Sequence, residues 1–433
     1  MNVSTKQQRL AELAKRRPEL SLTSLNHYLD LDWLSEAYQG LRKNSAPGQD
    51  GQTVRGYGEE LESNLPSLLE RAKTGRYFAP PVQRVHIPKE SGGETRPIGK
   101  PTTEDKLLQR AVAMLLEPIY EQDFLDCSYA FRPGRSAHDA LEALWRQSMA
   151  TGVQWILDVD MAKFFDTLEK SQLRAFVQHR VRDGVITRLI DKWLKAGVLE
   201  DGALHYPEDG VPQGGSISPI LSNVYLHYVL DLWFAEEVKP RLRGRAFMTR
   251  FADDVVMGFE YQEDADRVLR VLPKRLGKYG LKIHLEKTRL VAFGRPRASD
   301  AAKPGSFDFL GFTHYWGKSR RGKWVIKRKT SSKRFTRAIK RIGDWCRRNR
   351  HQLIAEQHRV LGQKLRGHCA YYGITGNGLW LQKFKVELQK RWQKWLNRRS
   401  RQAAMPWERF SRLLQRYRLP PAKVVHSIYV AKP

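Results

Sequence analysis

The sequence "TRFADDVVMGF" at residues 249–259 sets two adjacent aspartates inside an otherwise apolar run. Aspartate is a poor strand former, and an unpaired carboxylate is costly to bury. The β-branched and aromatic residues on both sides nevertheless predict a strand, a tight turn and a second strand over 246–259. Asp253 and Asp254 therefore lie at the tip of a predicted hairpin, where they need a partner that offsets their charge.

A second acidic strand is predicted at "WILDVDMAKFFDTLEK" (155–170), which continues into a helical pattern. Asp158 and Asp160 point to the same side of that strand because side chains two residues apart share a face. If one of them met the acidic hairpin, the carboxylates would repel one another unless cations neutralised them. Mg²⁺ prefers such oxygen ligands and leaves positions open for phosphates. A bare Asp-Asp pair is more often a solvated turn or a helix cap, so the metal site depends on its neighbours.

Two neighbouring segments favour phosphate chemistry. "GVPQGGSISPILSNVYL" (210–226) is a glycine-rich turn that leads into a predicted helix, with Ser218 as N-cap and Pro219 in the first turn. Such a turn lets the backbone approach a phosphate or a base pair closely. The predicted hairpin at 84–102 carries Lys89 and Arg96, two cations that suit a triphosphate better than they suit packing.

The charge is strongly positive and unevenly distributed. The 433 residues have a net charge of +30 and a pI near 10.1, which indicates a polyanion or an anionic surface as partner. Residues 317–402 contain 26 Lys or Arg and 3 Asp or Glu, so this segment carries +23. We therefore expect a domain boundary near 316–330.

Other features exclude several classes of protein. The three cysteines, Cys127, Cys346 and Cys369, are isolated, so neither a disulfide framework nor a paired-cysteine zinc site is expected. No apolar stretch approaches the roughly 20 residues that span a bilayer. The basic N-terminus has no apolar signal-peptide core, and Glu12 and Glu19 count against an organellar transit peptide. We expect a cytoplasmic protein without a membrane partner.

The order of motifs resembles group II intron-encoded reverse transcriptases with maturase activity, of the compact bacterial kind without an HNH endonuclease domain. The resemblance covers about residues 43–373 and rests on motifs that follow one another in the family's order. They are "KNSAPGQDG" (43–51), "IPKESGGETRPIGKPTTEDKLLQRAV" (87–112), "SYAFRPGRSAHDAL" (128–141), "DVDMAKFFDTLEK" (158–170), "GVPQGGSISPILSNVYL" (210–226), "RFADD" (250–254), "LGKYGLKIHLEKTRLVAFG" (276–294), "FDFLGFTHYW" (307–316) and "KLRGHCAYYG" (364–373).

The resemblance implies an α+β fold of the right-hand polymerase type. Its fingers would precede a palm whose antiparallel sheet carries the catalytic aspartates, and an all-α thumb or maturase domain would follow. We expect an N-terminal extension over 1–75, fingers and palm over 76–316, a basic helical thumb over 317–402 and a short C-terminal extension over 403–433. The last segment is too short for a nuclease domain and lacks paired Cys and His residues, but it could bind DNA or pack on the thumb.

The resemblance also assigns roles to single residues. Asp160, Asp253 and Asp254 match the metal-binding catalytic triad. Asp160 is preferred to Asp158 because the family pattern places the catalytic aspartate five residues before the second phenylalanine, here Phe165. Two Mg²⁺ ions are implied, with Mn²⁺ as a possible substitute. The residues that match the dNTP pocket are Lys89, Arg96, Phe165, Gln213 and Gly214. Phe165 would lie under the deoxyribose and exclude a ribose 2′-hydroxyl, although an ordinary core aromatic remains an alternative.

The implied partners are group II intron RNA, an RNA template with a DNA primer, dNTPs and target DNA, in a nucleoid-associated bacterial protein. RNA would bind the cationic face of the basic segment. The candidate contacts are Lys364, Arg366, Lys390, Arg391, Arg398 and Arg399. A predicted helix at 381–401 would place Leu381, Phe384, Leu388, Trp392 and Trp395 on its other face, more as core than as base-stacking residues. The motif at 364–373 has two interpretations, intron binding or tight helix–loop packing.

One departure from the family pattern is Phe251, where tyrosine is commoner; the change removes a hydroxyl that is not a metal ligand, so activity should survive. Three alternatives remain open. The protein could be an RNA-binding maturase with a vestigial polymerase, an RNA-templated RNA polymerase, or an intron-independent enzyme with a host role in defence or repair.

Overall fold

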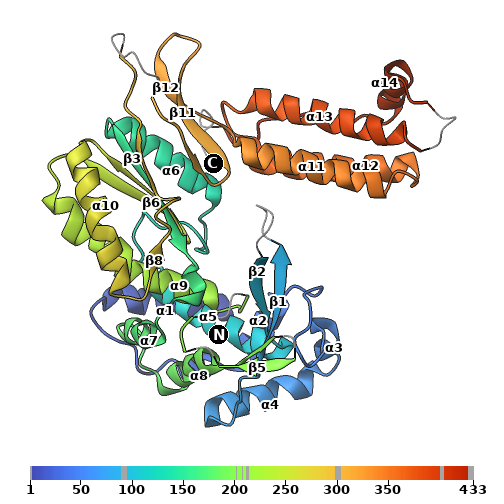
Figure 1. Cartoon of the computed structure of the whole chain (residues 1–433). Helices are drawn as coiled ribbons and strands as arrows, with labels where there is room; N and C mark the ends of the chain where they lie inside the picture. Colours follow the sequence, from blue (N-terminus) through green and yellow to red (C-terminus); the bar gives the residue numbers. More distant parts are fainter. Residues whose placement is uncertain are drawn as a thin grey trace. The chain divides into compact units, whose positions relative to one another are not determined.

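The fold is taken from a computed structural model of the chain (Figure 1). The structure describes residues 2–88, 95–200, 202–206, 208–210, 214–297, 304–399 and 404–427. The chain divides into two compact units. The first, unit 1, consists of Met1–Ala140 and Leu157–Leu290, and the second, unit 2, consists of Leu141–Ile156 and Val291–Pro433.

Unit 1 begins with helices that surround one buried helix, α5 (Thr103–Tyr120). Thr102 caps α5 by accepting a hydrogen bond from the Asp105 backbone N–H at 3.3 Å. Thirteen of its residues are buried, so α5 is apolar on almost all sides. The surrounding elements are α1 (Val3–Arg16), η1 (Asn26–Tyr28), α2 (Leu31–Gln39), α3 (Val54–Glu59) and α4 (Leu61–Thr74).

Two sheets lie in unit 1. The first has the strand order β2-β1-β4-β5, and its β1–β2 pair is the antiparallel hairpin that the sequence predicted, with residues 89–94 outside the described part. The second has the order β6-β7-β3-β8, and β9 also pairs with β3. The strands are β1 (Val82–Pro88), β2 (Thr95–Lys100), β3 (Trp155–Ala162), β4 (Val198–Glu200), β5 (Ala203–His205), β6 (Ala246–Phe251), β7 (Asp254–Phe259), β8 (Lys282–Ile283) and β9 (Arg289–Ala292).

The helix after the glycine-rich turn, α9 (Ser218–Leu226), begins one residue earlier than the sequence indicated. The N-cap position is Ile217, so Ser218 is the first helical residue and the prediction of Ser218 as the cap was wrong. The helix then widens into two π-helical segments, η3 (His227–Asp231) and η4 (Trp233–Val238). The remaining helices before residue 290 are α6 (Ala137–Ala150), η2 (Phe164–Asp166), α7 (Lys170–Gln178), α8 (Gly184–Lys195), η5 (Lys239–Arg241) and α10 (Gln262–Gly277).

Unit 2 contains a three-stranded antiparallel sheet and a helical bundle (Figure 1). The strands are β10 (Phe307–Phe309), β11 (Phe312–Lys318) and β12 (Trp324–Thr330). The helices are α11 (Ser332–Arg348), α12 (Ile354–Tyr372), α13 (Gly378–Leu396) and α14 (Trp407–Arg416). Their apolar faces meet in one core that includes Leu361, Leu388, Trp392 and Phe410.

The helix predicted at 381–401 is present as α13, and Leu381, Phe384, Leu388 and Trp392 are buried. One other expectation differs from the structure, because the segment expected to be helical from residue 317 begins with the end of β11 and continues into β12. The two compact units divide between Leu290 and Val291. Within the described ranges, we find no helix with the length and apolar character that crossing a bilayer requires.

Candidate active site

The paired aspartates lie at a two-residue hairpin turn. Strand β6 ends at Phe251, which pairs with Asp254 at the start of β7, so Ala252 and Asp253 form the turn. Ala252 has a φ of 55°, a left-handed conformation that is strained for a residue with a Cβ. Such strain persists only where surrounding contacts hold it in place.

Asp160 lies on β3, in the same sheet as the hairpin. Its backbone is anchored on both sides: its N–H donates to the Thr288 hydroxyl at 3.3 Å and its carbonyl accepts from the His284 N–H at 2.7 Å. Asp158, two residues earlier, forms an ion pair with Arg289 at 3.2 Å. Of the two, Asp160 is the carboxylate whose charge acts on Asp253 in the hairpin turn, which supports its choice over Asp158.

Asp160, Asp253 and Arg96 lie close enough to influence one another electrostatically. Burial raises the pKa of Asp253, and the Asp160 carboxylate raises it further, whereas Arg96 and Arg250 oppose the rise. A half-buried carboxylate beside a second carboxylate is destabilised in its charged form, and a cation between them would relieve this. The structure thus brings together two of the three predicted metal ligands and one predicted triphosphate contact.

Asp254, the third predicted ligand, is exposed at the first position of β7. Among the described residues, no group of three or more His, Cys, Asp or Glu side chains is gathered tightly enough to hold a metal ion. The donor set is nevertheless suited to Mg²⁺ in kind, because Asp160 and Asp253 supply the hard oxygen ligands that this ion prefers.

A buried arginine holds the hairpin turn. Arg250 and Asp231 are both fully buried and form a two-pronged ion pair, Nε to Oδ1 at 2.8 Å and Nη2 to Oδ2 at 2.6 Å. Arg250 also donates to the Asn223 Oδ1 at 3.1 Å, the Ser128 hydroxyl at 2.7 Å and the Ala252 carbonyl at 3.2 Å. All five N–H groups of the guanidinium are therefore used. Through its hydrogen bond to the Ala252 carbonyl, the Arg250 guanidinium holds the strained turn beside Asp253.

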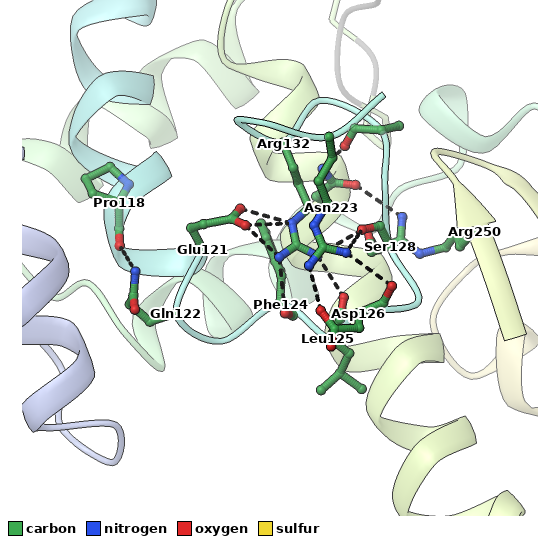
Figure 2. Close-up of polar contacts among 12 residues, drawn as sticks. Pro118, Glu121, Gln122, Phe124, Leu125, Asp126, Ser128, Arg132, Asn223 and Arg250 are labelled. Carbon is green, nitrogen blue, oxygen red and sulfur yellow. Dashed lines mark hydrogen bonds and ion pairs between the residues drawn. The ribbon is translucent and has the colours of Figure 1, made fainter. Parts of the chain in front are cut away.

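A second arginine organises the loop that packs on β6 (Figure 2). Arg132 contacts both carboxylate oxygens of Glu121 and donates to the Leu125 and Ser128 carbonyls at 2.7 and 2.8 Å. Asn223 donates to the Ala130 carbonyl at 2.7 Å and accepts from Arg250, so it joins this loop to the hairpin. The motif at 128–141 thus supports the hairpin through its backbone.

The predicted sites did not include Arg250, Asp231 or Asn223. The available signal was a basic residue inside the apolar strand 246–251, because an arginine there needs a buried partner. That partner, Asp231, lies on η3, and the sequence alone did not pair the two.

Only some of the residues predicted to contact the dNTP lie within the described ranges. Phe165 is half-buried and lines a pocket of about 310 Å³ together with Lys163, Lys170 and Arg84. Gly214 has a φ of 113°, and an added Cβ would clash with the Gly99 carbonyl oxygen, so the turn packs directly on β2. Lys89 and Gln213 lie outside the described residues.

The six predicted RNA contacts divide into two groups. Lys390 and Arg391 share Glu387 at 2.8 and 3.9 Å, and Arg399 donates to the Gln352 carbonyl at 2.6 Å. Lys364 and Arg398 instead lie over the rings of Trp345 and Trp395, and Arg366 is exposed on α12. Among the described residues, Lys364, Arg366 and Arg398 are therefore the charges of this set for which no carboxylate or carbonyl partner is found.

The motif at 364–373 packs against the β10–β11 turn. Tyr371 donates its hydroxyl to the Leu310 carbonyl at 2.8 Å, and the rings of Tyr371 and Tyr372 pack on Phe312. These contacts favour the packing interpretation for the two tyrosines.

Comparison with known proteins places these observations in a family. A family model described as reverse transcriptase (RNA-dependent DNA polymerase) matches residues 87–314. Protein YkfC of Escherichia coli is 32% identical over 363 residues, which cover 75% of this chain and 92% of that protein. Group II intron-encoded protein LtrA of Lactococcus lactis is 38% identical over 203 residues, 45% of this chain and 33% of LtrA. The match thus spans only a third of LtrA's length. Nuclear intron maturase 2 of Arabidopsis thaliana is 35% identical over 103 residues, 23% of this chain and 14% of that protein.

Proposed function

Because this chain belongs to the reverse transcriptase (RNA-dependent DNA polymerase) family, we propose that it extends a DNA primer on an RNA template with dNTPs. The observation that carries the proposal is the electrostatic interaction between Asp160 and Asp253: burial raises the pKa of Asp253, and the Asp160 carboxylate raises it further. A site that gains stability from a bound cation is what nucleotidyl transfer requires.

Within this proposal, the sheets and helices have the roles of a right-hand polymerase. The β1–β2 hairpin would belong to the fingers, the β6-β7-β3-β8 sheet to the palm, and α11 to α13 to the thumb. Residues 1–75 would form the N-terminal extension, 76–316 the fingers and palm, 317–402 the thumb, and 403–433 a C-terminal extension.

The chain's own side chains would divide the work of the reaction. When bound by Asp160, Asp253 and Asp254, two Mg²⁺ ions would neutralise phosphate charge and lower the pKa of the primer hydroxyl. Arg96, whose charge already acts on Asp253, would bind the triphosphate, with Lys89 and Gln213 as further contacts. Phe165 would lie under the sugar, and Gly214 would let the backbone approach the base pair. Rate enhancement would come mainly from positioning and charge stabilisation.

Primer extension on an RNA template with Mg²⁺ and dNTPs tests this proposal. We expect Asp253→Asn to reduce extension by at least about 100-fold, since it removes a charge at the reacting centre. The matched control is Asp158→Asn, which makes the same change two residues from Asp160 in a carboxylate paired with Arg289. Equal extension by Asp253→Asn and wild type would refute the assignment, provided that both proteins bind RNA equally.

The sugar-selecting role of Phe165 needs a separate measurement. We expect Phe165→Val to raise ribonucleotide incorporation relative to dNTP incorporation, because a smaller side chain leaves room for a 2′-hydroxyl. If wild type already incorporated rNTPs as well as dNTPs, the protein would be an RNA-templated RNA polymerase instead.

We also propose that the protein binds group II intron RNA and assists its splicing and mobility at target DNA. The support is the basic segment 317–402 and the relatives named as an intron-encoded protein and an intron maturase. Splicing of a candidate intron with and without the protein tests this function. A host role without an intron would be indicated by normal primer extension with no effect on splicing.

A further inference from the structure

The hairpin β11–β12 has one buried face and one partly exposed face. Phe312, His314 and Arg328 are buried on the inner face, whereas Tyr315, Lys327 and Lys329 alternate with them on the outer face. The pairing places Lys327 opposite Tyr315 and Lys329 opposite Thr313, so the two lysines follow one edge of the outer face.

Lys327 has a fixed direction along the strand. Its Cδ lies so close to Gly317 that an added Cβ there would be 2.9 Å away. Gly317 therefore leaves space for the lysine stem to cross β11, and this contact carries its ammonium group toward the exposed end of the hairpin.

Lys329 lies between two aromatic rings. Its ammonium nitrogen is 5.1 Å from the centre of the Tyr315 ring and 5.7 Å from that of Trp380 on α13. A second cation, Lys383, approaches the Trp380 ring at 4.9 Å. Lys327 and Lys329 on β12, together with Lys383 on α13, are here called the basic strip.

Hydrogen bonds hold the two parts of the basic strip together. The buried Asn377 accepts from the Thr330 N–H at 2.9 Å through its Oδ1 and donates to the Thr330 hydroxyl at 2.9 Å. Its carbonyl also accepts from the Trp380 N–H at 3.0 Å. Thr330 follows Lys329 in sequence, so Asn377 fixes Lys329 and Trp380 relative to each other before any ligand binds.

No carboxylate among the described residues pairs with the basic strip. The neighbouring carboxylate on β10, Asp308, accepts a hydrogen bond from the Thr313 hydroxyl at 2.5 Å. The hairpin end adds further exposed cations, which are Lys318, Arg320, Arg321 and Lys323.

We propose that the basic strip is a binding site for the phosphate backbone of a nucleic-acid strand. The Tyr315 and Trp380 rings orient lysine ammonium groups, and phosphate contacts carry no sequence information, so recognition by the strip is independent of sequence. The inference deepens the proposed nucleic-acid function and rests on it, but it assigns the contact to residues outside the candidate RNA contacts named above.

The test is the salt dependence of binding to a structured RNA of arbitrary sequence and to an RNA–DNA template–primer. The variant Lys327→Gln/Lys329→Gln/Lys383→Gln keeps the stems and removes three charges. Each lost phosphate contact lowers the slope of log K against log salt by roughly 0.7 to 0.9, so we expect a fall of about 2 to 3. The matched control, Lys239→Gln/Lys274→Gln/Lys278→Gln, removes three exposed charges from unit 1 and should change the slope by less than about 1.

A second variant tests the role of the Trp380 ring separately from the charges of the three lysines. Trp380→Leu keeps all three lysines, and we expect it to weaken RNA binding several-fold. Equal slopes for the two triple variants would overturn the proposal. A fall in slope confined to the template–primer would support the proposal and identify the duplex as the ligand of the basic strip. A fall in slope confined to free RNA would support it and identify a structured RNA as the ligand. If wild type bound RNA through the strip but extended no primer, the polymerase proposal would fail and the strip would stand.

Discussion

Two sets of cations, one in each unit, are used in opposite ways. In unit 1, Arg250 and Arg132 are buried, and their guanidinium groups are bonded to carboxylates and backbone carbonyls. In unit 2, Lys364, Lys383 and Arg398 remain at the surface and lie over tryptophan rings. A buried guanidinium with all its donors used specifies one backbone conformation, whereas a surface ammonium group stays available to a polyanion.

Net charge alone therefore does not identify a binding surface. Arg250 contributes as much to the total of +30 as Lys383 does, yet it reaches no solvent. What distinguishes them is the partner: a buried carboxylate in one case and an aromatic ring in the other. Substitutions in the two sets should therefore affect different observables.

The largest effect is expected for Arg250→Lys. Lysine keeps the charge but cannot donate to Asp231, Asn223, Ser128 and Ala252 together, and breaking a buried ion pair costs about 3 to 5 kcal/mol. Urea unfolding measures the loss. The control Arg270→Lys, at an exposed position of α10, should change stability by less than about 0.5 kcal/mol. Similar values for both would show that the buried pair does not support the hairpin.

The buried Asp105 carboxyl should make the free energy of unfolding depend on pH. Burial raises the pKa of Asp105 to about 7, although Tyr77 and Trp193 donate hydrogen bonds that oppose the rise. The folded protein then holds a proton that the unfolded chain releases above about pH 4. The resulting stabilisation is complete below pH 4 and is lost as pH rises through about 7, with a slope of at most about 1.4 kcal/mol per pH unit.

Asp105→Asn should remove this slope. Unfolding free energies of the two proteins between about pH 4 and 8 give the contribution by difference. Asp123, whose pKa is raised to about 6 by burial, is common to both and cancels. Parallel curves for the variant and wild type would contradict the assignment.

A smaller effect is expected for Ser128→Ala. The Ser128 hydroxyl accepts one of the five Arg250 hydrogen bonds, at 2.7 Å, and a bond from a charged donor contributes about 1.5 to 3 kcal/mol. The loss should appear in the free energy of unfolding and, through the turn, in primer extension. Unchanged stability would indicate that water replaces the hydroxyl.

The smallest effect on stability is expected for Lys364→Gln. This lysine is exposed, so the free energy of unfolding should change by no more than about 0.5 kcal/mol. If it contacts a phosphate, the salt slope of RNA binding should still fall by about 0.7 to 0.9. A loss of stability comparable to that of Ser128→Ala would place Lys364 among the structural cations.

The sequence predicted the parts of this site that depend on local pattern. The β-rich residues around 253 and 254 predicted the hairpin, which is present as β6 and β7. The partner of Arg250 was not predictable in this way, because Asp231 lies nineteen residues earlier on a helix of irregular period. The predicted boundary near residue 316 marks a change in the charge composition of the sequence. The division between Leu290 and Val291 instead reflects which residues pack together, and composition does not show this.

The π-helical segment η3 has a consequence for how relatives can vary in length. Asp231 is the last residue of that segment, and its position depends on the wider turn that precedes it. Deleting one residue between His227 and Asp231 would restore ordinary α-helical geometry and rotate the following residues by about 100°. The carboxylate would then leave Arg250, so this short stretch should tolerate substitutions far better than a single-residue gap.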